Sequence, residues 1–150
     1  MKPGKDYIGV SVGAVIYNNE GKVFMALRGE EVRNEPGLWE FPGGGLEFME
    51  EFEDALQREL MEECGVEIEI VETIAIGNNI IKKENQHWVA PSFLCRITHG
   101  IPEIKEPHKC KDIGWFSIQE IQSMPITEVC QSELANLLKQ KDRLKSYISF

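Results

Sequence analysis

Residues 44–66 read GGLEFMEEFEDALQRELMEECGV, and this stretch decides the fold of the chain more than any other. From Glu51 to Cys64 it holds no glycine or proline and is rich in helix formers, and Gly65 stands where a glycine commonly ends a helix. The run from Pro42 to Gly45 lets the backbone turn sharply and approach a ligand closely. The stretch therefore predicts a glycine turn that leads directly into a helix.

On a helical wheel this segment has an apolar stripe and an acidic shoulder. The stripe is formed by Phe52, Leu56, Leu60 and Cys64. Three carboxylates, those of Glu59, Glu62 and Glu63, lie at its edge, where like charges repel and partial burial raises the cost. Arg58 supplies a positive charge but is expected to point about 100° away from Glu59. A divalent cation explains the carboxylates better, although a solvated acidic face stays open as the alternative.

The segment resembles the Nudix box, Gly-x5-Glu-x7-Arg-Glu-U-x-Glu-Glu-x-Gly-U, where U is a bulky aliphatic residue. Every specified position matches: Gly44, Glu50, Arg58, Glu59, Leu60, Glu62, Glu63, Gly65 and Val66. The preceding residues, from Trp39 to Gly43, are also similar to the family. The resemblance implies an α+β Nudix fold with a mixed β-sheet sandwiched between helices (α/β/α). It also implies a single Nudix hydrolase domain over residues 1–150.

The resemblance further implies a metal site. Glu59, Glu62 and Glu63 would bind Mg²⁺, helped by the carbonyl of Gly44, and Mn²⁺ is a possible substitute. Magnesium suits this set because it takes hard oxygen ligands and few carboxylates, with phosphate oxygens of the substrate completing its shell.

Catalytic roles follow from the same resemblance. Arg58 would orient a glutamate through a charge-assisted hydrogen bond, and Glu50 would support the loop through Arg58 or through a water molecule. The general base is either a box glutamate, such as Glu62 or Glu59, or a glutamate from a later loop. Glu84 is the candidate from a later loop, with a merely solvated side chain as the alternative. Two positions, Met49 and Glu51, depart from common family members and affect the expected loop geometry.

The rest of the chain is predicted to form β-strands and one terminal helix. Residues 7–17 and 22–28 flank the turn Asn18–Gly21 and predict a β-hairpin. Further strands are expected at 38–41, 66–82, 87–98 and 112–116, and a terminal helix at 128–144.

Composition narrows the function. A net charge of −9 over 150 residues argues against binding to polymeric nucleic acid, and an acidic protein that handles phosphates needs a cation. The four cysteines form no zinc pattern and are expected to be reduced. No apolar run is long enough to span a bilayer, and no targeting segment is recognised, so we expect a cytoplasmic protein without membrane partners.

The substrate is expected to be a small nucleotide. The segments Gly44–Phe48 and Glu106–Cys110 resemble the nucleoside triphosphate diphosphatases, which release pyrophosphate. An ADP-ribose or nucleotide-sugar pyrophosphatase is the alternative, and a nucleotide-sensing module without turnover is a second one. Phe48, Trp88 and His87 are candidates for contact with the base. The resemblance also implies a homodimer.

Overall fold

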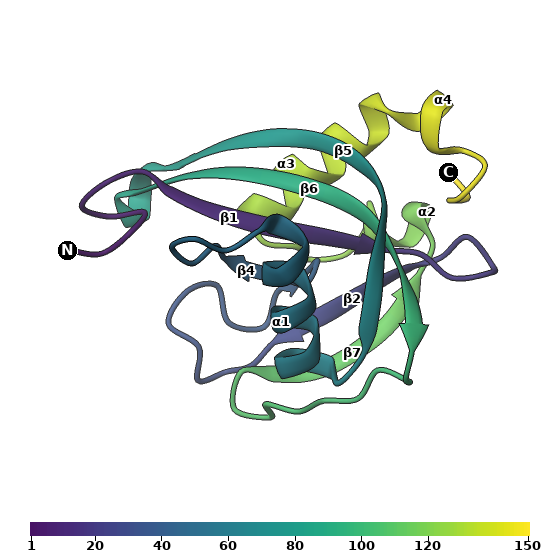
Figure 1. The fold of residues 1–150 in the computed structure, drawn as a ribbon, viewed down its shortest axis with the longest axis horizontal. Helices are drawn as coiled ribbons and strands as arrows, with labels where there is room; N and C mark the ends of the chain where they lie inside the picture. The colour runs from purple at the N-terminus through teal and green to yellow at the C-terminus, as the bar shows by residue number, and fades with distance from the viewer.

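The computed structural model describes all residues from Met1 to Phe150. Seven β-strands and four α-helices follow one another along the chain (Figure 1). The strands are β1 (Gly9–Ile16), β2 (Val23–Arg28), β3 (Trp39–Glu40), β4 (Gly43–Gly45), β5 (Glu67–Ile81), β6 (Gln86–His99) and β7 (Cys110–Phe116). The helices are α1 (Phe52–Cys64), α2 (Ile118–Ile121), α3 (Glu128–Lys139) and α4 (Lys141–Leu144), and a 3₁₀ turn (Lys82–Glu84) joins β5 to β6.

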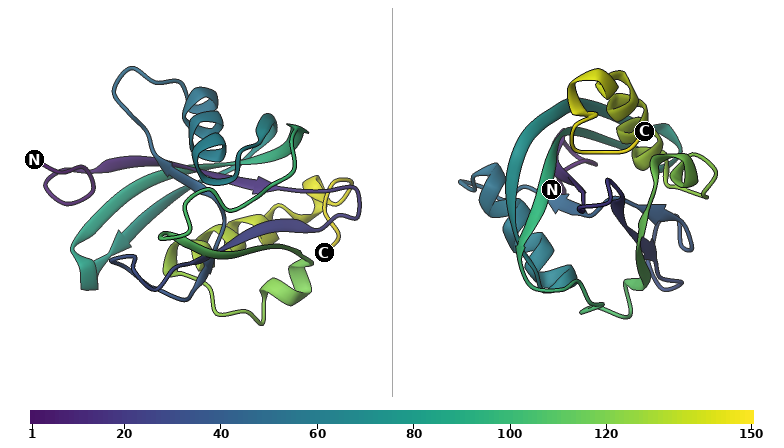
Figure 2. Two further views of the ribbon diagram at one scale, coloured as in Figure 1. Left: turned by 90° about the horizontal axis from the view of Figure 1, so that it is seen from below. Right: turned by 90° about the vertical axis from the view of Figure 1, so that its right-hand side faces the viewer.

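The strands form two sheets. The larger has the order β4-β1-β6-β5, with β1 parallel to β6 and the other pairs antiparallel. The smaller is antiparallel, with the order β3-β2-β7. Helices α1 and α3 lie on opposite sides of the larger sheet (Figure 2). The expected α+β architecture, with a mixed sheet between helices, is confirmed.

Apolar side chains of the central strands cover both faces of the larger sheet, because successive side chains of a strand point to opposite faces. On β1, Ala14 and Ile16 pack with Leu60 of α1, whereas Val15 packs with Leu137 of α3. The near-continuous burial of Val12 and Ala14–Ile16 follows from this double coverage.

The hairpin predicted from residues 7–17 and 22–28 is wrong. Asn18 and Gly21 form the expected turn, in which the Asn18 N–H donates to the Lys22 carbonyl at 3.0 Å. Beyond it, a single bridge joins Tyr17 and Val23, and β2 then enters the smaller sheet. β6 pairs along one edge of β1, and β4 pairs with Ser11–Gly13 on the other edge, so a long hairpin with β2 is blocked beyond the turn.

The helix predicted over residues 128–144 is interrupted. At Gln140 the backbone leaves helical geometry, with φ −100° and ψ 13°, and separates α3 from α4. The break keeps Leu144 and Ile148 in the same buried cluster as Leu137. All four α-helices fall short of the length and apolar character that a membrane-spanning helix needs.

The helix predicted from the box is confirmed as α1. Gly65 ends it in the left-handed conformation, with φ 71°, and its N–H donates to the Met61 carbonyl at 3.0 Å. Leu56, Leu60 and Cys64 are buried as expected. Phe52 differs from the expected stripe: it is 43% exposed and contacts the ring of Phe93 at a centroid distance of 5.7 Å.

Candidate active site

Arg58 ties the loop before α1 to the helix. Its guanidinium donates to both carboxylate oxygens of Glu50, from Nε at 2.9 Å and from Nη2 at 3.0 Å. The same group donates to the Gly45 carbonyl at 3.1 Å. The hydrogen bond from Arg58 and a second one from the Glu47 N–H lower the pKa of Glu50 to about 2. This bidentate pair holds the loop against the first turns of the helix.

Arg58 also reaches Glu59, which corrects the expectation that it points away from this residue. Its Nη1 donates to Glu59 Oε1 at 2.8 Å, and it lies 3.9 Å from Glu62 Oε2. An arginine side chain is long enough to bend along the helix surface, and the anchor at Glu50 fixes its head there. The side chain therefore orients the Glu59 carboxylate directly.

The glycine turn approaches the same carboxylate. A Cβ atom added at Gly44 would lie 2.3 Å from the carboxyl carbon of Glu59, so any side chain at this position would displace that carboxylate. Gly44 pairs with Val12 of β1, which fixes the turn at the edge of the larger sheet. The backbone of the turn and the Glu59 carboxylate are thus adjacent.

Glu63 is the most strongly perturbed carboxylate of the box. Burial raises its pKa well above the ordinary value, and the negative charges of Glu59, Glu40 and Glu106 raise it further. A bound cation would offset both effects. Three or more carboxylates do not converge into a preassembled metal cage. The donor set of carboxylates and a glycine carbonyl still fits a magnesium ion that keeps water and takes up phosphate oxygens.

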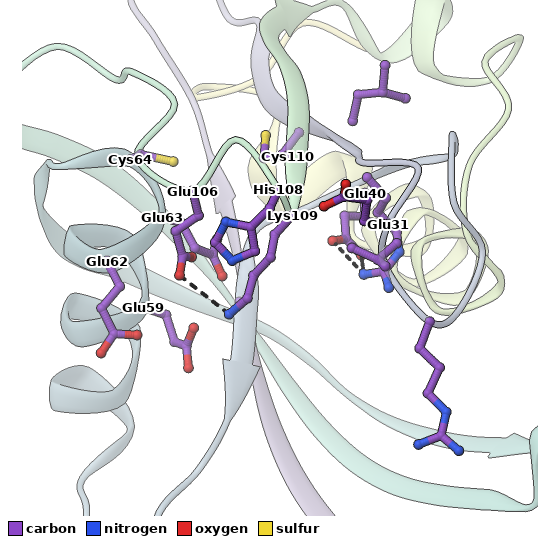
Figure 3. A pocket seen from close by; sticks show the side chains of 16 residues that line it. Glu31, Glu40, Glu59, Glu62, Glu63, Cys64, Glu106, His108, Lys109 and Cys110 are labelled. Carbon is purple, nitrogen blue, oxygen red and sulfur yellow. Dashed lines mark hydrogen bonds and ion pairs between the residues drawn. The ribbon is translucent and has the colours of Figure 1, made fainter.

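A cavity of about 610 Å³, here called the catalytic cavity, lies beside α1 (Figure 3). Glu59, Glu62 and Glu63 project toward it from the helix. The opposite wall carries basic and acidic side chains from β2, from β3 and from the loops that precede β3 and β7, namely Arg28, Glu31, Arg33, Glu40, Glu106, His108 and Lys109. Carboxylates for a cation and cations for phosphates therefore meet in one space.

The sequence gave no role to any side chain of this wall, and Glu106 and Lys109 are the pair among them nearest to the box glutamates. The Lys109 ammonium lies 3.4 Å from a Glu106 carboxylate oxygen, and Glu106 is close enough to Glu63 to raise its pKa (Figure 3). The segment Glu106–Cys110 was recognisable as family-like, but its distance from the box in sequence gave no sign of this proximity.

Arg28 and Glu40 separate the catalytic cavity from a second hollow. Their side chains pair at 3.1 Å. Burial raises the pKa of Glu40, and the charge of Arg28 offsets this only in part. Both residues line the catalytic cavity and also the hollow on the α3 side of the larger sheet.

We call that second hollow the inner cleft. It comprises two adjoining spaces of about 250 and 230 Å³ between the larger sheet and the start of α3. Its walls include Ser11 and Asn79 from the sheet, and Thr127, Val129 and Glu133 at and after the start of α3. Gly43 lines both hollows, and Gly44 lines the inner cleft and lies against the Glu59 carboxylate, so the glycine turn stands between the two spaces.

The other predicted site residues are not brought together. Glu84 and Trp88 line the inner cleft and not the catalytic cavity. The Trp88 indole donates to Gln86 Oε1 at 2.8 Å. His87 lies in a separate hollow with Nε2 2.7 Å from Asn78 Oδ1, and Phe48 is 95% exposed outside both spaces. The placement of His87 and Phe48 does not favour contact with a substrate in either space.

Comparison with known proteins agrees with this geometry. The family model for the NUDIX domain matches residues 8–136. A CTP pyrophosphohydrolase of Escherichia coli (strain K12) is 32% identical over 120 residues, which cover 78% of this chain and 82% of that protein. An RNA pyrophosphohydrolase of Pseudoalteromonas translucida is 38% identical over 133 residues, which cover 86% of this chain and 62% of that protein.

Solved structures give the same relationship. The crystal structure of a MutT NUDIX hydrolase from Burkholderia pseudomallei aligns with a TM-score of 0.78 and 29% identity, covering 86% of this chain and 97% of that one. The box residues, the fold and these relatives agree. The chain therefore belongs to the Nudix hydrolase family and is an enzyme that acts on phosphoanhydride bonds.

Proposed function

We propose that this enzyme is a Mg²⁺-dependent diphosphatase that converts a nucleoside triphosphate to the monophosphate and pyrophosphate. The observation that carries the proposal is the catalytic cavity, in which the box glutamates face Arg28, Arg33 and Lys109. A chain of phosphates needs both partners along its length, a cation held by carboxylates and positively charged side chains. The E. coli relative named CTP pyrophosphohydrolase supports a nucleoside triphosphate as substrate.

Glu59, Glu62 and Glu63, with the Gly44 carbonyl, would hold the metal ion. The ion would lower the pKa of the attacking water and neutralise phosphate oxygens, as divalent ions do in phosphoryl transfer. Arg58 keeps Glu59 in place, and Glu50 keeps Arg58 in place.

The general base is best placed at Glu106. Its carboxylate lines the catalytic cavity with the box glutamates, whereas Glu84 faces the inner cleft. Glu106 would take a proton from the water that attacks the α-phosphorus, as the bond to the leaving pyrophosphate breaks. Lys109, which neighbours Glu106, is in a position to contact the phosphates. Comparing Glu106→Gln with Glu84→Gln tests this choice: the first should lower kcat by about a hundredfold or more, and the second by far less.

A substrate panel tests the proposed reaction. The purified enzyme is incubated with four nucleoside triphosphates, ADP-ribose and a nucleotide sugar, in Mg²⁺, in Mn²⁺ or in EDTA, and the products are separated by anion exchange. We expect pyrophosphate and monophosphate from a triphosphate, in the presence of metal only. Preferential cleavage of ADP-ribose into two monophosphates would instead establish the alternative activity. Nucleotide binding without turnover of any compound would point to a sensing module.

The homodimer and the cytoplasmic location stay predictions. Light scattering behind a sizing column tests the first.

A further inference from the structure

The larger sheet extends beyond the helix that covers it. Strands β1, β5 and β6 continue past the start of α1 toward the N-terminus of the chain (Figure 1). On β1, Val12, Ala14 and Ile16 face α1 and pack with it. Strand register and alternation place a further set of apolar residues on the same side of the sheet, beyond the helix. We call this set the sheet-end face, and it comprises Ile8, Val10, Ile76, Ile80, Val89 and Pro91.

Three isoleucines of the sheet-end face are open to solvent. Ile76 is 71% exposed, Ile8 is 55% exposed and Ile80 is 53% exposed. Isoleucine is among the residues most often buried in folded proteins. On the opposite face of β5, Ile74 and Ile81 are buried. This end of the sheet is therefore covered on one side only, and its other side is an apolar surface.

The loop before α1 enlarges this surface. The Leu46 N–H donates to the Val10 carbonyl at 2.9 Å, and the Phe52 ring packs against β6, so both ends of the loop lie against the sheet. Between them, Phe48 and Met49 each expose nine-tenths of their surface or more. At about 200 Å² for a large side chain, the exposed isoleucines and these loop residues offer on the order of 800 Å². A stable protein–protein interface buries about 800 Å² on each partner.

Charged side chains of opposite sign stand at two borders of the surface. Because the strand order is β4-β1-β6-β5, the loop after β4 and the turn after β5 lie at opposite edges of the sheet. Glu51 and Glu53 are exposed at the first border, and Lys82 and Lys83 are exposed at the second. None of these four residues forms an ion pair within the chain, and Glu84 of the same turn lines the inner cleft instead. The surface thus has an apolar centre, an acidic border and a basic border.

We propose that the sheet-end face is the interface of a homodimer, in which two copies of the chain pack these faces together about a twofold axis. A twofold interface must be complementary to itself. The acidic border of each copy would meet the basic border of the other, with the isoleucines between them. A partner of uniform charge would be repelled by one of the two borders. The inference does not depend on the proposed function, because the sheet-end face shares no residue with the lining of the catalytic cavity.

Sedimentation velocity over a range of protein concentrations tests the interface. We expect the parent to sediment as a dimer at micromolar concentration. Ile76→Lys should raise the dissociation constant of the dimer by about thirtyfold or more, because it places an unpaired charge at the centre of the interface. Ile80→Lys is a second variant with the same expected result. The matched control is Ile101→Lys, which changes an isoleucine that is 86% exposed in the loop between β6 and β7 and should leave the dissociation constant unchanged.

Charge reversal tests the pairing of the two borders. One variant carries Lys82→Glu with Lys83→Glu, and the other carries Glu51→Lys with Glu53→Lys. Each variant alone should be monomeric, because like charges would face each other at both borders of the dimer. Mixed in equal amounts, the two variants should form a heterodimer, since opposite charges then meet at both borders. An affinity tag on one variant identifies the mixed species, and circular dichroism checks that every variant is folded.

Three results would overturn the inference. The first is a parent that stays monomeric at the highest concentration. The second is an equal dissociation constant for Ile76→Lys, Ile80→Lys and Ile101→Lys. The third is a mixture of the two charge-reversed variants that stays monomeric. Failure of the proposed function would be seen elsewhere, as the absence of pyrophosphate release in the substrate panel, and would leave these three results unaffected.

Discussion

The Arg58 network and the inner cleft satisfy their polar groups in opposite ways. Arg58 is bonded to Glu50, Glu59 and the Gly45 carbonyl, all within a short stretch of chain. In the cleft, the side chains of Asn79 and Glu133 come from distant elements, and no polar side-chain atom is both buried and without a hydrogen-bond partner. The first region is complete by itself and holds the loop from Gly45 to Glu50 against α1. The second is assembled from distant segments, and its polar groups are satisfied by contact with solvent.

The two regions meet at the glycine turn. Gly44 lies against Glu59 and also lines the inner cleft. The predictions below test each region and the difference between them, in order of decreasing effect.

The largest effect is expected at the box glutamates. Glu59→Gln or Glu63→Gln should lower kcat by about a thousandfold or more, because an amide cannot replace a carboxylate as a ligand for the metal ion. Steady-state kinetics in Mg²⁺ measures the loss, and circular dichroism checks that each variant is folded. Glu53→Gln, on the exposed side of the same helix, should keep parental activity. Full activity in the Glu59 or Glu63 variant would contradict the metal site.

Arg58→Lys should reduce activity by roughly ten- to a hundredfold, since lysine cannot form the bidentate pair that positions Glu59. It should also make the stability of the fold less dependent on pH in the acid range, because the pKa of Glu50 is lowered mainly by its hydrogen bond with Arg58. The folded pKa of Glu50 lies near 2, below the ordinary 4.5, so its contribution to stability is present above 4.5 and is lost as the pH falls toward 2.

Melting temperatures measured between pH 3 and 7 test this prediction. The fall in melting temperature from pH 7 to pH 3 should be smaller in Arg58→Lys than in the parent. The variant lacks the stabilising pair with Glu50 already at neutral pH, so acid has less stability to remove. Arg96→Lys, which changes an exposed ion pair with Glu69, is the control and should follow the parental curve. A parental curve for Arg58→Lys would argue against the pairing with Glu50.

The inner cleft predicts the opposite pH dependence. The folded pKa of Glu133 is about 8, above the ordinary 4.5. Its contribution to stability is therefore complete below 4.5 and is lost as the pH rises through 8. Glu133→Gln has no proton to lose and should melt about 2–4 °C higher than the parent at pH 8.5, with a smaller difference at pH 5. Equal melting temperatures at both values would show that this carboxyl is ionised and solvated.

The smallest effect concerns the start of α1. Glu51 occupies the N-cap without a side-chain hydrogen bond, whereas the Thr127 hydroxyl accepts from the Cys130 N–H at 3.1 Å at the start of α3. Glu51→Ser should add the missing bond and raise the free energy of unfolding by about 0.5–1 kcal/mol in urea titrations. Thr127→Ala should lower it by a similar amount, and no change in either variant would mean that capping is unimportant here.

Local rules predicted the helix and its end correctly. The absence of glycine and proline from Glu51 to Cys64, and the glycine at position 65, act over a few residues and need no partner. The hairpin prediction failed because strand pairing depends on distant partners: β6 pairs along one edge of β1 and β4 pairs with the middle of the other edge, and both lie later in the chain. The interruption of the last helix at Gln140 also depends on tertiary packing. The chain must turn there so that Leu144 and Ile148 can be buried in the core with Leu137.

The sequence by itself determined the family, helix α1 and the carboxylates that can hold a metal ion, because these features are encoded within 23 contiguous residues. Only the tertiary structure decided that Glu106 faces Glu63 while Glu84 does not, and that Asn79 and Glu133 share one cleft. The physical reason is that strand pairing and helix packing set which distant segments are adjacent. The sequence alone does not distinguish one loop glutamate from another, because the arrangement of the sheets decides which of them lies beside the box.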